Sequence, residues 1–195
     1  QPSMISTIPN LLTLFRIALI PFIAVLYLTE APGIWVAGIF LLASATDWLD
    51  GFLARRLNQI SSFGEFLDPV ADKLVVAAVL VLLVSDTGLM ENVVSQNLFI
   101  IAVIVILGRE IAISALREWV AQSGLQPSLA VSALGKIKTT VQIIAISLLL
   151  YRDDLFGIPV LRAGEVMLYV AAAFTIWSMV GYLKAAWPAI SREVK

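Results

Sequence analysis

Two pairs of aspartates stand at helical spacing in the stretch DWLDGFLARRLNQISSFGEFLDPVAD, which runs from Asp47 to Asp72. Asp47 and Asp50 are three positions apart, and Asp68 and Asp72 are four apart, so each pair lies on one face of a helix. Two antiparallel neighbouring helices would bring the two pairs together in one cleft. Because four carboxylates at close range repel one another, the spacing predicts a site for cations.

The residue types narrow the choice of cation. The chain contains no histidine and no cysteine, which excludes thiol nucleophiles, disulfides, Cys/His zinc sites and histidine bases. Carboxylate oxygens alone suit Mg²⁺ or Mn²⁺, and these ions favour phosphate-bearing partners. The cluster could hold two ions, and a metal pair stabilises both the attacked phosphoryl group and the leaving oxygen. We therefore expect Asp47, Asp50, Asp68 and Asp72 to bind Mg²⁺ or Mn²⁺ for chemistry on phosphate.

Small residues accompany the acidic pairs. Gly51 and Ala54 lie on or beside the carboxylate face of the helix that carries Asp47, and glycine is costly inside a helix unless a close approach needs it. These positions predict room for a flat or bulky ligand beside the metal ions. Gly64 is expected in the connecting turn, and Arg55 adds positive charge at the mouth of the cleft.

The composition indicates what kind of scaffold holds these residues. Of the 195 residues, 60% are hydrophobic and only 14% are charged, whereas a soluble domain carries about a quarter charged residues. Six apolar segments are each near the ~20 residues of a spanning helix: Leu11–Leu28, Ile34–Leu53, Pro69–Val84, Leu98–Val120, Val131–Leu150 and Val166–Trp187. Because backbone groups in lipid must be hydrogen-bonded internally, the predicted class is all-α, with six transmembrane helices.

Basic residues predict the orientation in the membrane. Six spans put both termini on one side, and every Lys and Arg except Arg152 and Arg162 falls on that side. The positive-inside rule therefore predicts cytoplasmic termini and an acidic cleft at the cytoplasmic surface. The net charge of −1 gives no basic excess that would indicate a nucleic-acid partner.

We expect a single membrane domain from residue 4 to residue 195. The N-terminal segment lacks the charged start and the small-residue cleavage site of a signal peptide. Gln1 to Ser3, which precede Met4, are interpreted as a remnant of expression.

The acidic stretch resembles a known signature. The pattern D-x-x-D-G-x-x-A-R, eight residues, G-x-x-x-D-x-x-x-D is similar to that of the CDP-alcohol phosphotransferases. It is filled without departure by Asp47, Asp50, Gly51, Ala54, Arg55, Gly64, Asp68 and Asp72. The resemblance implies six helices, a cleft formed by the second to fourth spans and open to the cytoplasm, and a homodimer. It further implies that the first three aspartates bind the metal ions, and that Asp72 contributes to the metal site and serves as the base.

Other stretches bear on the acceptor alcohol. IPNLLTLFRIALIPF, LDPVADK, GREIAISALREW and GKIKTTVQ resemble the bacterial branch of this family that uses glycerol 3-phosphate. The resemblance implies an enzyme of the bacterial inner membrane. It would transfer the phosphatidyl group from CDP-diacylglycerol to glycerol 3-phosphate, giving phosphatidylglycerol phosphate and CMP.

Four positively charged side chains could bind the phosphate of such an acceptor. Arg109, Arg117, Lys136 and Lys138 all approach one cytoplasmic pocket on the expected topology, and arginine suits bidentate phosphate binding. The two lysines point about 200° apart on a helix, so only one of them would face the ligand. The alternative is that these charges only anchor the helices on the cytoplasmic side.

Each of three residues near the N-terminus has two possible roles. Arg16 either extends to the lipid headgroups or faces the carboxylates and the pyrophosphate of CDP-diacylglycerol. Asn10 and Thr13 either cap the start of the first helix or contact the nucleotide. We include all three in the expected CDP-diacylglycerol site with Asp47, Asp50, Gly51, Ala54, Arg55 and Gly64.

Two kinds of rival function stay open. The same chemistry could use another acceptor, namely inositol phosphate, serine or phosphatidylglycerol. A divalent-cation transporter is a rival from another class, because carboxylates within a membrane also mark ion pathways. The clustering of the charges at one end of the helices favours the enzyme over the transporter.

Overall fold

The computed structural model describes residues 8–57, 62–122 and 133–193. They form α1 (Ile8–Leu28), α2 (Gly33–Leu57), α3 (Ser62–Ser85), α4 (Thr87–Asn92), α5 (Gln96–Gln122), α6 (Ala133–Tyr151) and α7 (Val160–Glu193). The described residues contain no strand and only one isolated bridge, between Leu155 and Ile158. The predicted all-α class is confirmed for this part of the chain, and the short α4 is an addition to the six expected helices.

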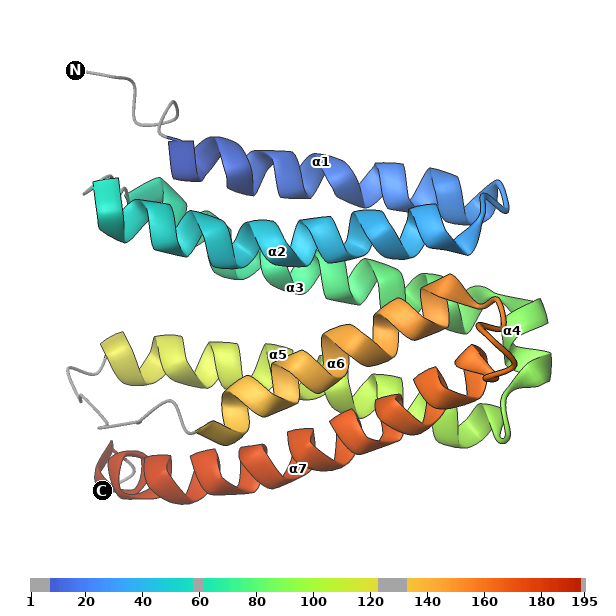
Figure 1. The fold of residues 1–195 in the computed structure, drawn as a ribbon. Helices are drawn as coiled ribbons and strands as arrows, with labels where there is room; N and C mark the ends of the chain where they lie inside the picture. Colours follow the sequence, from blue (N-terminus) through green and yellow to red (C-terminus); the bar gives the residue numbers. More distant parts are fainter. Residues whose placement is uncertain (1–7, 58–61, 123–132, 194–195) are drawn as a thin grey trace.

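The long helices form two groups that share one core. Helix α1 packs against α2 and α3, α7 packs against α5 and α6, and α2 contacts α6 across the two groups. Figure 1 shows that α1 begins and α7 ends at the same end of the bundle, while α4 lies at the other end. Fully buried side chains from both groups, including Phe40, Leu80, Ile106 and Leu149, fill the space between them.

The exterior of the bundle suits a lipid environment. Three helices contain segments long and apolar enough to cross a membrane: Asn10–Leu28, Gln96–Leu116 and Val160–Lys184. Shorter apolar stretches, Gly33–Asp47 and Ile137–Tyr151, lie in α2 and α6. Acidic and basic residues in α2, α3 and α6 interrupt the apolar sequence there. These features describe a membrane protein with three candidate spans.

The third helix extends beyond the expected apolar segment. Helix α3 begins at Ser62, before Pro69, and Gly64 is a buried residue in its first turn. The expectation that Gly64 lies in a connecting turn is therefore wrong. A glycine costs a helix only about 1 kcal/mol relative to alanine, so the helix extends through it once the neighbouring residues pack.

Two polar networks join the helices at the end that carries α4. Asp86 caps α4 by accepting from the Leu89 N–H at 3.0 Å, and it also accepts from the Tyr27 hydroxyl at 2.8 Å. Arg152 pairs with the same carboxylate, and its guanidinium lies 4.2 Å from the centre of the Tyr27 ring. These contacts tie α1, α4 and the segment after α6 together.

The second network surrounds Glu165, which is only 1% exposed. Its carboxylate accepts from the Val94 N–H at 2.9 Å, the Tyr169 hydroxyl at 2.7 Å and the Arg162 guanidinium at 3.1 Å. The backbones of α2 and α6 also approach closely, because a Cβ on Gly33 would lie 1.9 Å from the Tyr151 carbonyl oxygen. Hydrogen bonds, ion pairs and close backbone packing therefore hold the helices together at this end of the bundle.

Replacing Asp86 with asparagine is expected to lower the free energy of unfolding by about 1–3 kcal/mol, because it weakens charge-assisted hydrogen bonds. Partial burial favours the neutral acid, but the bonds from Leu89 and Tyr27 and the charge of Arg152 outweigh it and hold the pKa of Asp86 below its ordinary value. A lowered pKa stabilises the fold above the unfolded pKa of about 4, and this stabilisation is lost as the pH falls through the folded pKa.

Thermal unfolding in detergent from pH 3 to pH 7 would measure this effect. The wild type should lose stability below about pH 4 more steeply than Asp86→Asn does. Asp154→Asn, in an exposed residue of the neighbouring segment, is the matched control and should behave as the wild type. Equal pH profiles for the wild type and Asp86→Asn would contradict the assigned network.

Candidate active site

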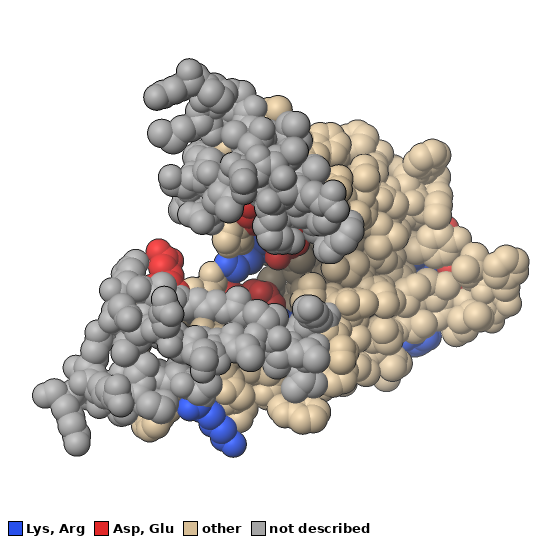
Figure 2. Space-filling model, turned by 60° about the vertical axis from the view of Figure 1, so that its left-hand side comes forward, with Lys and Arg blue, Asp and Glu red and all other residues tan. Residues whose placement is uncertain are grey.

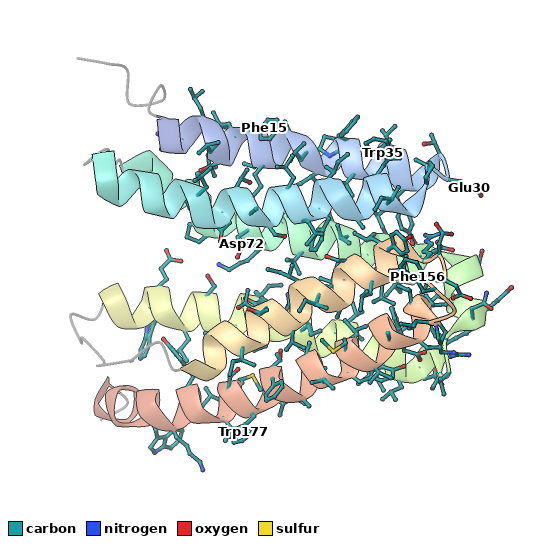
Figure 3. The ribbon with its side chains drawn as sticks, viewed as in Figure 1. Phe15, Glu30, Trp35, Asp72, Phe156 and Trp177 are labelled. Carbon is teal, nitrogen blue, oxygen red and sulfur yellow. The ribbon has the colours of Figure 1, made fainter. Side chains whose placement is uncertain are left out.

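A polar pocket lies between the two helix groups. Its lining comes from five helices: Arg16 of α1, Ala43, Ser44 and Asp47 of α2, Asp72, Lys73, Val75 and Val76 of α3, Glu110 of α5, and Thr139, Gln142 and Ile143 of α6. Figure 2 shows acidic and basic side chains gathered in a hollow of the surface. In Figure 3, Asp72 lies between the α1–α3 group and the α5–α7 group.

Helix α1 contacts the acidic residues of both neighbouring helices. Arg16 donates from Nη1 to Asp47 Oδ1 at 2.8 Å, and the Thr13 hydroxyl donates to Asp68 Oδ1. Thr13 and Arg16 are three residues apart and therefore lie on one face of α1. The side chains of α1 thus link the carboxylates of α2 to those of α3.

The N-terminal residues can now be assigned. Arg16 is 1% exposed and lines the pocket, so it faces the carboxylates rather than the lipid headgroups. Asn10 and Thr13 are fully buried inside α1, which begins at Ile8. The interpretation of Asn10 and Thr13 as caps is wrong, because a cap flanks the helical residues and these two lie within them.

Two of the expected metal ligands share this pocket. Asp47 and Asp72 both line it, and Asp68 lies one helical turn before Asp72. The charge of Asp72 interacts with the negative charges of Asp47 and Glu110 and with the positive charges of Arg16 and Lys73. The metal ligands that Asp47, Asp68 and Asp72 offer are all carboxylate oxygens, which Mg²⁺ and Mn²⁺ prefer. These residues therefore fit the expected ions.

Not all of the expected ligands can be placed. The described side chains include no cluster of three Asp, Glu, His or Cys residues in a metal-binding arrangement. The remaining expected site residues fall within α2, α5 and α6, but their side chains lie outside the described part of the structure. They are Asp50, Gly51, Ala54, Arg55, Arg117 and Lys136.

The expected phosphate-binding cations meet at a carboxylate. Lys138 is 3% exposed and pairs with Glu110, and Arg109, 12% exposed, lies 3.4 Å from the same Glu110 oxygen. Arg109 also reaches the Ser178 hydroxyl of α7 at 3.4 Å. The structure therefore brings together Arg109 and Lys138, from α5 and α6, at the edge of the pocket.

Several pocket residues were not selected from the sequence. Lys73 donates to the Ser114 hydroxyl, and Gln142 is 5% exposed beside the pocket. Their positions held usable information, since Lys73 directly follows Asp72 and Gln142 lies one turn after Lys138. Glu110, which directly follows Arg109 in the sequence, also lines the pocket.

The sequence from residue 6 to residue 177 matches the model of the CDP-alcohol phosphatidyltransferase family. The chain belongs to the CDP-alcohol phosphatidyltransferase family. Use of divalent metal ions is general in this family, which agrees with the oxygen donors in the pocket.

Similar CDP-alcohol phosphatidyltransferases are known from enteric bacteria. A protein of Escherichia coli (strain K12) is 50% identical over 184 residues, which cover 92% of this chain and 94% of the relative. A protein of Salmonella choleraesuis (strain SC-B67) is 49% identical over 183 residues, with the same coverage. Both are named CDP-diacylglycerol–glycerol-3-phosphate 3-phosphatidyltransferase. The likeness extends over almost the whole of both chains.

Proposed function

We propose that this chain transfers the phosphatidyl group of CDP-diacylglycerol to glycerol 3-phosphate, forming phosphatidylglycerol phosphate and CMP. The observation that carries the proposal is one pocket lined by Asp47, Asp72 and Glu110, in which Glu110 also pairs with the cations Arg109 and Lys138. Such a pocket offers oxygen ligands for metal ions and positive charge for a second phosphate. The names and the extent of the similar relatives favour glycerol 3-phosphate over the other acceptors.

The donor would bind at the acidic side of the pocket. Asp47, Asp50, Asp68 and Asp72 would hold Mg²⁺ or Mn²⁺, as a pair of ions. Bound ions would neutralise the negative charge of the pyrophosphate and stabilise the leaving group. The other residues proposed for donor binding are Asn10, Thr13, Arg16, Gly51, Ala54, Arg55 and Gly64.

The acceptor would bind at the opposite side of the same pocket. Arg109, Arg117 and one of the lysines 136 and 138 would hold the phosphate of glycerol 3-phosphate. Asp72 takes the proton from the 1-hydroxyl, and the oxygen forms a bond to the phosphorus that bears the lipid. The bond between that phosphorus and the CMP oxygen breaks, and CMP leaves with the electron pair. Catalysis then depends mainly on positioning and charge complementarity.

The proposed setting is the bacterial inner membrane, crossed by six helices, with the pocket and both termini on the cytoplasmic side. The excess of basic residues on the terminal side supports this orientation. Phe15, Trp35 and Trp177 are exposed on the outside of the bundle, where they would contact lipid (Figure 3). A homodimer of single-domain subunits is also proposed, from the family resemblance.

One assay tests the reaction and separates the rivals. Purified protein receives CDP-diacylglycerol, Mg²⁺ and labelled glycerol 3-phosphate, and the label is expected in the lipid phase only when the donor is present. CMP release that responds to serine or inositol phosphate instead would identify another soluble acceptor. A lipid product formed without any soluble alcohol would identify a lipid acceptor. Metal flux into proteoliposomes with no lipid product would favour the transporter.

Removing divalent ions with a chelator is expected to lower the transfer rate by at least about 100-fold, because the carboxylates then repel the pyrophosphate. Adding Mg²⁺ or Mn²⁺ should restore the rate, whereas Ca²⁺, which prefers more ligands and longer bonds, should restore it poorly. Electron paramagnetic resonance measures Mn²⁺ binding directly, so it gives a readout that is independent of turnover. Full activity in excess chelator would refute the metal site.

A further inference from the structure

Glu110 lines the pocket together with Asp47 and Asp72, and neither the proposed metal site nor the proposed reaction uses it. Its Oε1 is the common partner of Lys138 Nζ and Arg109 Nη1. The carboxylate is 26% exposed and lines the pocket, whereas the Lys138 and Arg109 side chains are largely buried. An anion that entered from the pocket would therefore meet Glu110 before it met either cation.

The contacts of Arg109 leave room for a better partner. Its distance to the Glu110 carboxylate is 3.4 Å, longer than the about 2.7–2.9 Å that is usual between a charged nitrogen and a carboxylate. Its distance to the Ser178 hydroxyl is also 3.4 Å. Its Nε atom is buried and has no hydrogen-bond partner among the described residues. A tetrahedral phosphate offers three or more acceptor oxygens, so it could use donors that Glu110 does not.

The charges point in the same direction. Arg109 and Lys138 carry two positive charges, and Glu110 carries one negative charge. A phosphate monoester has a charge near −2 at neutral pH, and both cations already converge on a single oxygen. One phosphate group at that position could contact both cations, but it would then lie against the Glu110 carboxylate.

We propose that Glu110 occupies the place of the acceptor's phosphate while the pocket is empty, and that a phosphate-bearing acceptor displaces it from Arg109 and Lys138. This inference rests on the proposed function, since it assigns these two cations to the acceptor. Glu110 is a positioning residue: it keeps the cations paired in the empty pocket, and its negative charge keeps weakly binding anions out. The pocket would thereby select an acceptor that also offers the hydroxyl to Asp72.

Glu110→Gln keeps the shape of the side chain and removes its charge, so it tests this exchange. The variant should bind phosphate more tightly, because the empty state loses its counter-ion and the bound state loses a repulsion. We expect the KM for glycerol 3-phosphate to fall about fivefold and the inhibition constant of inorganic phosphate to fall about tenfold. The turnover number should fall or stay unchanged. The product also carries a phosphate, so tighter phosphate binding slows its release. The KM for CDP-diacylglycerol should change less than about twofold.

Two further variants complete the experiment. Glu118→Gln removes the same charge from an exposed position further along α5 and should leave both constants at their wild-type values. Glu110→Asp keeps the charge but shortens the reach to Lys138, so it should lower the phosphate inhibition constant about threefold. This second variant serves if the first does not fold.

The results have distinct meanings. A lower KM together with stronger phosphate inhibition supports the exchange of Glu110 for phosphate. A higher KM with weaker inhibition would overturn it, because Glu110 would then be a fixed support of the cations. Unchanged constants in both Glu110 variants would also overturn it. Incorporation of glycerol 3-phosphate by the wild type tests the proposed function separately, whichever result the variants give.

Discussion

The Asp72→Asn variant is expected to transfer no measurable phosphatidyl group, with kcat at least about 1,000-fold below that of the wild type. The substitution removes the proposed base and weakens the proposed metal site at the same time. Asparagine has nearly the same shape, and Asp72 is exposed to the pocket, so the fold should be preserved. The rate of CMP release measures the loss of transfer. The melting temperature in detergent shows whether the fold is preserved.

Asp68→Asn should have a similar effect on transfer, although Asp68 has a different environment. The Thr13 hydroxyl donates to its Oδ1, and an asparagine carbonyl could still accept that hydrogen bond. Loss of activity would therefore reflect the lost charge rather than a broken contact between α1 and α3. Asp154→Asn, in the exposed segment before α7, is the control and should retain full activity. If Asp68→Asn and Asp72→Asn were both fully active, the metal-site interpretation would have to be abandoned.

Arg109→Ala is expected to raise the KM for glycerol 3-phosphate by about 10- to 100-fold, the loss of one or two charge-assisted hydrogen bonds. The KM for CDP-diacylglycerol should change much less, because the donor is assigned to the acidic side of the pocket. Initial rates with each substrate varied in turn would separate the two constants. Lys138 still pairs with Glu110 in this variant, so Lys138 stays available to the phosphate, whereas the net positive charge of the three side chains is lost.

The matched control for Arg109→Ala is Lys184→Ala. Lys184 is an exposed residue of α7, the same helix whose Ser178 contacts Arg109. Its removal changes the net charge equally and should leave both Michaelis constants unchanged. An Arg109→Ala variant with the wild-type rate and KM for glycerol 3-phosphate would show that this arginine only anchors α5.

Local sequence patterns determined much of what the structure contains. The apolar runs predict the long helices, and all six are present in the described part of the chain. Asp47 and Asp72 were selected from spacing and residue type, and they line one pocket. Such inferences succeed because the interval between two residues fixes their relative direction along a single helix. The ends of the helices follow less directly from the sequence. Gly64 shows why, because a helix can include a residue that usually forms turns.

The contacts between helices required the tertiary structure. The sequence could not decide whether Arg16 faces Asp47 or the lipid, nor reveal that Thr13 reaches Asp68 and that Glu110 holds Lys138. Each of these contacts depends on the rotation of one helix against another, which the packing of many buried side chains sets together. The sequence alone thus determined the class of the protein and the groups available for chemistry. Only the packed bundle decided which of those groups meet, because interhelical distances are a property of the whole core.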